Sequence, residues 1–465
     1  MKGTPMRQPR IGLLGLYLEL YDRAMPQVRP RVDAFYGTIA QELGRRGLAV
    51  TTAPVCRQQP EFAQAVAAFE QVGVDAIVTL HLAYSPSLEA ADVLAGTRLP
   101  IIVLDTTPAA GYGPGQDPDA LMFNHGIHGV QDLCSVLRGR GKRFQVEAGH
   151  CQQSDVLDRI AGWAQAAALA TGMRQARVGI IGAPFPGMGD FAVPFAALRE
   201  SIGMEVIPAE PSYLAALVPS PDAPTVAEEM AADREAFDTE GLDADSHRES
   251  VRAGLAVRRW LEEEDLSAFT CNFLDIGGLG LPTVPFLEAS KAMARGLGYA
   301  GEGDVLTAAL VGVLAQAAPT TFTEMFCPDW AGNRVFLSHM GEVNPDLLTA
   351  PGLVARPFPW AEVRPPVHPA GMLQAGEAAL VNLAPVPGTY QCMVWPVDMV
   401  APEGPNRMEG SIHGWLAPRF PVAEFLASYS RLGGTHHCAL VYGAQAAWLA
   451  HRLAVMMDWE VACWA

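Results

Sequence analysis

Apolar positions in the first third of the chain alternate between short continuous runs and helical repeats. The runs Asp75–Leu82 and Pro100–Asp105 are bounded by turn residues, which is typical of parallel strands covered on both faces. A helical repeat over Arg31–Arg46 separates two further strand patterns, Arg10–Leu16 and Ala49–Ala53. This alternation predicts a doubly wound α/β domain, because strands joined through helices pair in parallel.

The pattern repeats once and then changes. A second strand–helix set begins at Arg177 with RVGIIG, whereas alternating runs such as Val335–Met340, separated by Pro and Gly, predict an antiparallel sheet or barrel. The expected fold class is α/β, with two Rossmann-like doubly wound α/β domains followed by a C-terminal antiparallel β-barrel domain. The expected boundaries are 1–172 for the first domain, 173–318 for the second, and 319–465 for the barrel with its closing helix.

Charge and composition narrow the function classes. The 465 residues include 32 Lys and Arg against 50 Asp and Glu, a formal charge of −18. Such a chain repels phosphates, so we expect no nucleic-acid partner and no basic membrane-surface role. No apolar run reaches the roughly 18 residues that a membrane span needs. The eight cysteines form no CxxC pair, which favours reduced thiols and a cytoplasmic protein.

A carboxylate precedes a predicted helix near the middle of the chain. Asp304 is a good N-cap, and Leu306, Leu310 and Val313 then recur at helical spacing. Glu302 therefore lies in the loop before a helix N-terminus, where the positive end of the helix favours the ionised form. An ionised carboxylate is what a divalent cation needs.

A predicted hairpin supplies a second carboxylate and a histidine. If Asp329 faces Arg334 across the turn, the register places Glu324 opposite His339. Direct cross-strand partners hold their Cβ atoms about 4.5–5.5 Å apart, so both side chains could reach one metal ion. A buried Glu–His hydrogen bond without metal is the other interpretation, since either arrangement offsets the cost of burying the polar pair.

The sequence GGTHHCALVYG adds a pair of histidines at the start of a strand. Strand alternation places His437 on one face and His436 on the other, so one of the two is expected to reach a shared site. Two Glu and two His suit Mn²⁺, Co²⁺ or a similar ion, because the HxH and HExxH spacings typical of catalytic zinc are absent. Two carboxylates beside a cation fit proton transfer next to a carbonyl.

The blocks GEGDVLTAAL, TFTEMF, LSHMGEVNP and GGTHH resemble, in order and spacing, the active-site blocks of the L-arabinose isomerase family. Further matches are HLAYSPS, FNHGIHG and FTCNFLDI. The resemblance implies two Rossmann-like domains and a C-terminal barrel, assembled as a homotrimer or homohexamer. It also implies a Mn²⁺-dependent aldose–ketose isomerase that converts L-arabinose or a related sugar through an enediol.

Carried over residue by residue, the resemblance implies metal ligands and sugar contacts. Glu302 and Glu324 would move the proton between C1 and C2, and His128 would reach the sugar of a neighbouring subunit. Gly189 stands where the family has an arginine that faces the substrate, so the identity of the sugar stays open. The implied metal ligands are Glu302, Glu324, His339 and His437, and the implied substrate contacts are His81, His128, Met188, Phe273 and His436.

Two other function classes stay open at this stage. Paired Rossmann-like domains also build non-catalytic sugar-binding proteins, and a metal-dependent epimerase or lyase would use the same ligands. His81, at the end of a predicted parallel strand, is either a ligand contact or a surface histidine. His247 lies in a charged helix and is expected to be solvated.

Overall fold

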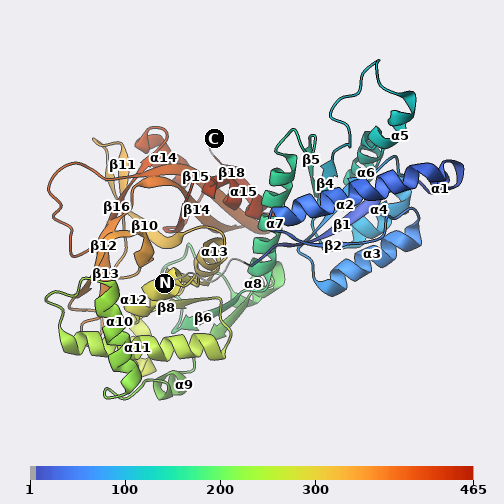
Figure 1. Ribbon diagram of the computed structural model, residues 1–465. Helices are drawn as coiled ribbons and strands as arrows, with labels where there is room; N and C mark the ends of the chain where they lie inside the picture. Colours follow the sequence, from blue (N-terminus) through green and yellow to red (C-terminus); the bar gives the residue numbers. More distant parts are fainter. Residues whose placement is uncertain (1–6, 464–465) are drawn as a thin grey trace. The chain divides into compact units, whose positions relative to one another are not determined.

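The computed structural model describes residues 7–463, which form two compact units, 7–171 and 172–463 (Figure 1). The first unit is built on one five-stranded sheet in the order β2-β1-β3-β4-β5, with every pairing parallel. Its strands are β1 (Arg10–Leu16), β2 (Ala49–Thr52), β3 (Ala76–His81), β4 (Ile101–Asp105) and β5 (Phe144–Ala148). Its helices are α1 (Glu19–Ala24), η1 (Pro26–Val28), α2 (Arg29–Arg45), α3 (Gln59–Val72), α4 (Ser87–Gly96), η2 (Pro118–Ala120), α5 (Leu121–Asn124), α6 (Ile127–Gly139) and α7 (Val156–Arg174), which runs into the second unit.

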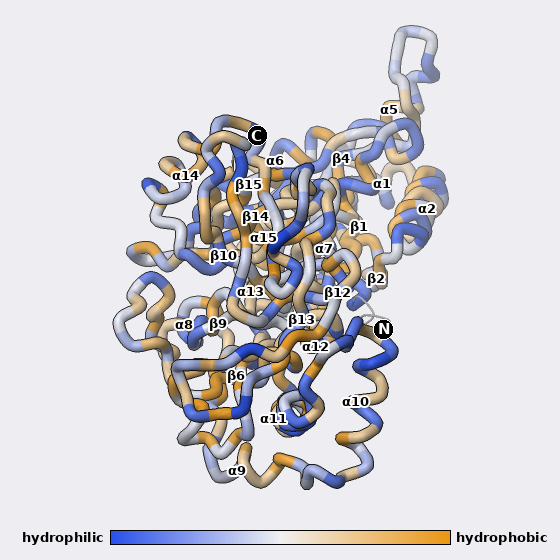
Figure 2. The backbone as a smooth tube through the Cα atoms, turned by 90° about the vertical axis from the view of Figure 1, so that its left-hand side faces the viewer, coloured by the Kyte–Doolittle hydropathy of each residue, from blue (hydrophilic) through white to orange (hydrophobic). Residues whose placement is uncertain are grey.

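Helices cover both faces of this sheet. Phe69 of α3 packs against Gly12, and Tyr36 of α2 packs against Gly15. Positions 12 and 15 of β1 face opposite sides, so α2 and α3 lie on opposite faces. Figure 2 shows hydrophobic and hydrophilic residues mixed along α2, as expected of a helix that buries one stripe.

The second unit contains a four-stranded parallel sheet in the order β7-β6-β8-β9. Its strands are β6 (Arg177–Ile181), β7 (Glu205–Pro208), β8 (Ala268–Cys271) and β9 (Gly298–Gly301). The helices of this part are α8 (Phe195–Ser201), α9 (Pro211–Ala216), α10 (Pro224–Ala236), α11 (Ala244–Glu263), η3 (Phe273–Leu279), α12 (Phe286–Ala294) and α13 (Val305–Ala315).

Six strands of the same unit close an antiparallel barrel. The order is β16-β11-β10-β17-β14-β15, and the pairing of β15 with β16 closes the ring. The barrel strands are β10 (Thr320–Asp329), β11 (Arg334–Ser338), β14 (Gly376–Val386), β15 (Thr389–Val400), β16 (Ile412–Pro418) and β17 (His437–Tyr442). Further elements are η4 (Pro345–Leu347), β12 (Leu348–Ala355), β13 (Val367–Leu373), α14 (Val422–Arg431), α15 (Ala446–Met456) and β18 (Glu460–Cys463).

The predicted fold class is therefore confirmed, with parallel α/β sheets first and an antiparallel barrel last. The boundary expected near residue 318 stays a prediction, because the parallel sheet and the barrel belong to one compact unit. Among residues 7–463, every helix is too short or too polar to cross a bilayer.

Helix α13 positions the site because it is apolar on all sides. Its residues Val305–Leu314 are all buried, and it packs against strands of both the parallel sheet and the barrel (Figure 1). A Cβ on Gly298 would lie 2.0 Å from the carbonyl oxygen of Ala308, so strand β9 and α13 approach backbone to backbone. The N-terminus of α13 is thereby held beside the barrel.

One expectation about a single side chain is wrong. His247 was expected to be solvated, but it is 2% exposed and its Nε2 lies 2.9 Å from Oδ2 of Asp233. The helix α11 that carries it is packed against α10 and α12, so the charged pattern of its sequence serves a buried ionic network as well as the surface.

Candidate active site

Glu302 lies in a loop whose backbone conformation is constrained by close contacts with neighbouring residues. Its φ of 54° is in the left-handed region, which non-glycine residues rarely adopt. The neighbouring Gly303 has φ 93°, and a Cβ there would lie 2.5 Å from Cα of Pro184. A Cβ on Gly301 would lie 3.1 Å from Cε1 of His339. The Gly-Glu-Gly sequence thus lets the backbone pass beside an imidazole while holding the glutamate in a strained conformation, which is common at functional sites.

Asp304 joins the helix to the cluster. Its Oδ1 accepts a hydrogen bond from the backbone N–H of Thr307 at 2.9 Å, which confirms the predicted N-cap. Its Oδ2 lies 3.0 Å from Nδ1 of His437, a role that the sequence analysis missed. One carboxylate therefore caps α13 and orients an imidazole.

The predicted register of the hairpin is wrong by one residue at Glu324. Asp329 pairs with Arg334 as expected, but a bulge between Met325 and Cys327 shifts the pairing, so that Glu324 faces Ser338. His339 follows the end of β11 instead of lying within it. The contact survives the shift, because Nε2 of His339 lies 3.3 Å from Oε1 of Glu324.

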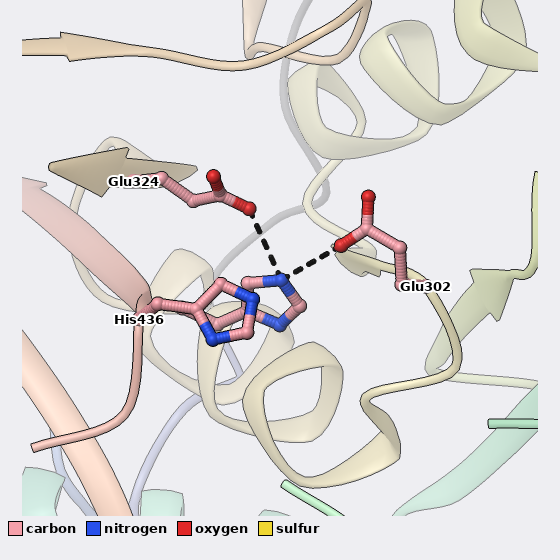
Figure 3. Close-up of side chains that lie close together, drawn as sticks. Glu302, Glu324 and His436 are labelled. Carbon is pink, nitrogen blue, oxygen red and sulfur yellow. Dashed lines mark hydrogen bonds and ion pairs between the residues drawn. The ribbon is translucent and has the colours of Figure 1, made fainter. Parts of the chain in front are cut away.

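The two glutamates and two histidines predicted as ligands converge. Nε2 of His437 lies 2.9 Å from Oε2 of Glu302 and 3.1 Å from Oε1 of Glu324. Nε2 of His339 also lies 3.6 Å from Oε1 of Glu302. Figure 3 shows Glu302 and Glu324 extending from different elements toward one imidazole nitrogen. Helix N-terminus, hairpin and β17 thus each bring donors to one point.

A second carboxylate orients the other imidazole. Nδ1 of His339 lies 2.5 Å from Oε2 of Glu342, and the hydroxyl of Tyr299 donates to Oε1 of Glu342 at 2.6 Å. Both histidines thus bind an acid through Nδ1 and direct Nε2 toward the glutamate pair, the arrangement that metal-ligating histidines usually have. Sequence reasoning missed Glu342, although its place three residues after His339 was the available signal.

The electrostatics of the cluster follow from burial and excess negative charge. Burial alone would raise the pKa of Glu324, but hydrogen bonds from His339 and His437 lower it to about 2. Burial would lower the pKa of His339, but the charge of Glu342 and hydrogen bonds to Glu302 and Glu324 raise it well above its ordinary value. Burial would also raise the pKa of Glu302, but the same hydrogen bonds lower it, so Glu302 and Glu324 are both ionised and can bind a cation.

His436 also reaches the cluster, contrary to the prediction that one histidine of the pair would do so. Ligand atoms of Glu302, Glu324, His436 and His437 all lie within 4.8 Å of one another (Figure 3). Strand alternation does not apply, because β17 begins at His437. Nδ1 of His436 lies 2.6 Å from Oδ2 of Asp190, so an acid anchors this ring too.

Two predicted sugar contacts lie beside the Glu302 loop. The backbone N–H of Phe185 donates to the carbonyl of Glu302 at 2.9 Å, and Met188 belongs to the turn that follows. The ring of Phe273 lies 5.5 Å from that of Phe185. Met188 and Phe273 are therefore both linked to Glu302 through Phe185.

The remaining two predicted contacts, His81 and His128, lie in the unit 7–171. His81 is 3% exposed at the end of β3, and neither ring nitrogen has a hydrogen-bond partner among the described residues. It is therefore not a surface histidine. His128 is exposed on α6, with its ring 6.2 Å from that of His125.

Comparison with known proteins agrees with the motifs. The family model described as L-arabinose isomerase central domain matches residues 226–319. The L-arabinose isomerase of Nocardioides sp. is 29% identical over 79% of this chain and 76% of its own length. The chain is thus similar to L-arabinose isomerases over most of its length. Two further relatives have similar identity. The L-arabinose isomerase of Herpetosiphon aurantiacus is 28% identical over 69% of this chain and 66% of its own length, and that of Geobacillus kaustophilus is 27% identical over 69% of this chain and 67% of its own length.

Proposed function

We propose that this protein is a member of the L-arabinose isomerase family and a metal-dependent aldose–ketose isomerase acting on L-arabinose or a closely related sugar. One observation carries the proposal: two buried histidines direct their Nε2 atoms at the buried Glu302 and the partly buried Glu324, while acids hold both Nδ1 atoms. Burial would lower the pKa of both imidazoles, but the carboxylates raise it well above its ordinary value, so each Nε2–H donates to carboxylate oxygens. A divalent cation bound at this point would take the place of those two protons.

The donor set fits a divalent cation held by Glu302, Glu324, His339 and His437. Two carboxylate oxygens and two imidazole nitrogens suit Mn²⁺, with Co²⁺ as an alternative. Bound there, the ion would polarise the sugar oxygens and stabilise negative charge that develops on them. His436, anchored by Asp190, would contact the substrate at the exposed side of the cluster.

The protein itself would move the proton. Glu302 and Glu324 approach the cluster from two elements, so one can take the proton from C2 and return it to C1, while the other moves a proton from O2 to O1, through an enediol. The rings of Phe191 and Phe322 lie 4.8 Å and 5.0 Å from that of His437 and exclude water from that side. The acids Asp304 and Glu342 would keep both imidazoles in the orientation that ligation needs.

Assembly and location complete the proposal. We expect a homotrimer or homohexamer in which His128, exposed on α6, serves the site of a neighbouring subunit, as the family resemblance implies. Light scattering that finds an active monomer would contradict this. The cysteines form no disulfide among the described residues, which fits the reducing cytoplasm.

The test is an assay of aldoses and ketoses with Mn²⁺ and with EDTA. We expect aldose–ketose conversion with Mn²⁺, loss with EDTA, and solvent deuterium at the reacting carbon when the proton exchanges during the enediol lifetime. An epimer or a cleaved product would assign the same carboxylates to an epimerase or a lyase. If no sugar is converted with any divalent cation, the enzyme interpretation gives way to a sugar-binding protein.

A further inference from the structure

Tyr299 is a buried tyrosine that reaches the candidate metal site through another residue. It belongs to β9, three positions before Glu302, and is 1% exposed. Its hydroxyl donates to Oε1 of Glu342 at 2.6 Å, and Oε2 of Glu342 lies 2.5 Å from Nδ1 of His339. Tyr299, Glu342 and His339 thus form one chain of hydrogen bonds that ends at a predicted metal ligand.

The carboxylate of Glu342 has a defined partner at each oxygen. Oε2 accepts from the backbone N–H of Gly341 at 3.0 Å as well as from Nδ1–H of His339, and Oε1 accepts from the hydroxyl of Tyr299. Glu342 is buried, so bulk water has little access to either oxygen. Because a buried carboxylate oxygen without a donor costs free energy, the hydroxyl of Tyr299 fixes the rotation of this carboxylate.

The loop that carries Glu342 is held separately from its side chain. The hydroxyl of Ser290 on α12 accepts a hydrogen bond from the backbone N–H of Val343 at 3.2 Å. Helix α12 therefore positions the backbone of the loop, whereas Tyr299 on β9 positions the carboxylate. A change at Tyr299 can thus alter the orientation of the carboxylate while the loop stays in place.

Aromatic packing holds the ring of Tyr299. Its centroid lies 4.9 Å from that of Phe269 and 6.2 Å from that of Phe322, edge-on in both cases. The ring of Phe322 in turn lies 4.7 Å from that of His339. Phenylalanine would keep these contacts, so Tyr299→Phe removes the hydroxyl and leaves the packing.

The donor that holds Glu342 carries no charge. Among the described residues, Glu342 forms an ion pair with His339 and none with Lys or Arg, whereas Glu288 is held by two arginines. Burial and the charge of Glu342 raise the pKa of Tyr299 well above its ordinary value, so the hydroxyl is protonated near pH 7. A neutral donor orients the carboxylate without cancelling the negative charge that attracts a cation to the cluster.

We propose that Tyr299 is a positioning residue for the metal site, which acts through Glu342 to keep Nε2 of His339 directed at the glutamate pair. The inference rests on the proposed function, because it takes His339 as a ligand of a divalent cation. When the cation takes the place of the proton on Nε2, the Nδ1–H stays on Glu342. Strand β9 then positions Glu302 through the chain and His339 through a hydroxyl.

The central experiment measures Mn²⁺ binding to Tyr299→Phe in the absence of sugar. Protein freed of metal with EDTA and dialysed is titrated with Mn²⁺, and the free ion is measured by electron paramagnetic resonance. Outer partners of a metal-ligating histidine are worth about 10–100-fold in affinity. Tyr299 acts through a second group, so Tyr299→Phe should raise Kd about 10-fold. At saturating Mn²⁺, kcat should return to within about two-fold of wild type, because the hydroxyl touches no reacting atom.

Tyr36→Phe is the matched control. The hydroxyl of Tyr36 is also buried and donates to the carbonyl oxygens of Leu13 at 2.5 Å and Ala53 at 3.0 Å, in the unit 7–171. Its removal should leave the Kd for Mn²⁺ within about two-fold of wild type. An equal rise in both variants would mean that loss of any buried hydroxyl weakens the site, and the proposal would be wrong.

A double-mutant cycle shows whether the hydroxyl acts through Glu342. Glu342→Ala should raise the Kd for Mn²⁺ about 10–100-fold. In that background Tyr299→Phe should add less than about two-fold, because the acid on which the hydroxyl acts is gone. A further full 10-fold rise would mean that Tyr299 acts by another route, which overturns the proposal.

Mn²⁺ binding and sugar conversion together separate this inference from the proposed function. A higher Kd in Tyr299→Phe, but not in Tyr36→Phe, supports the positioning role even if no sugar is converted. An unchanged Kd overturns the role and leaves the isomerase intact, and a wild-type protein that binds no divalent cation overturns both. If Tyr299→Phe fails to fold by circular dichroism, Glu342→Gln replaces it with the same expected rise in Kd, because a neutral amide holds the Nδ1–H less strongly than a carboxylate.

Discussion

Two largely buried clusters of charged side chains lie in the unit 172–463, and they balance their charge differently. Between α10, α11 and α12, the carboxylates of Glu229, Asp233 and Glu288 pair with Arg258, Lys291 and Arg295. Lys291 lies 2.7 Å from Glu229, and Arg258 lies 2.7 Å from both Glu229 and Glu288. Each carboxylate in this network has a permanent cation as a partner.

The candidate active site has an excess of acids instead. Glu302, Glu324, Asp304 and Glu342 contact two histidines. Even with both imidazoles protonated, the four carboxylates leave a net charge of −2, which one divalent cation would neutralise. The comparison teaches that a balanced cluster joins helices, whereas an unbalanced one is built to take up a ligand.

The sharpest way to break this comparison is to replace one glutamate in the active site. Glu324→Gln should lower turnover by at least about 10²–10⁴-fold, because it removes a proton carrier and weakens the metal site together. The free energy of unfolding should stay within about 1 kcal/mol, since the fold does not depend on this excess charge. Steady-state kinetics with saturating Mn²⁺ and urea denaturation measure the two effects. Near-normal turnover with metal bound would show that Glu324 is not an acid–base group.

The same change in the balanced network should have the opposite result. Glu229→Gln leaves Arg258 and Lys291 with one partner fewer, and should cost up to about 3 kcal/mol of stability. The side chain is 18% exposed, so the loss should fall below that of a fully buried pair. Turnover per folded molecule should be unchanged. A stable but inactive Glu229→Gln protein would contradict the division between the clusters.

Metal binding should distinguish the clusters through thermal stability. At a free Mn²⁺ concentration about 100-fold above Kd, ligation stabilises the folded state by roughly 2.7 kcal/mol. The melting temperature of the wild type and of Glu229→Gln should therefore rise with Mn²⁺ and fall back with EDTA, while that of Glu302→Gln should hardly respond. An equal rise in Glu302→Gln would place the ion elsewhere.

Lowering the pH should reduce the free energy of unfolding through the balanced network, by less than the changes predicted above. Burial would raise the pKa of Glu229, but Arg258 and Lys291 lower it to about 2 from an ordinary value of 4.5. The unfolded chain therefore takes up this proton first, so the contribution to stability is present above pH 4.5 and is lost as the pH falls toward 2. After solvent screening it should be on the order of 1 kcal/mol. Urea denaturation of wild type and Glu229→Gln should converge over this range, and parallel curves would contradict the assignment.

Local patterns in the sequence determined the fold class and the residues of the cluster. The strand–helix alternation, the later change to alternating strands and the Asp304 N-cap depend on neighbours within a few positions, so one sequence is enough to read them. The Glu302, Glu324, His339 and His437 set followed from spacing together with the family resemblance. All four side chains meet in the structure.

Tertiary structure decided how those residues meet. The bulge after Met325 shifts the hairpin by one residue, and hydrophobic periodicity does not reveal a single extra residue in a strand. The partners of the histidines come from distant segments: Asp304 lies 133 positions from His437, and Asp190 lies 246 from His436. The burial of His247 and the contact of the Tyr299 hydroxyl with Glu342 depend on what packs around each ring. Such contacts arise only when the chain folds, because they join surfaces that no local pattern relates.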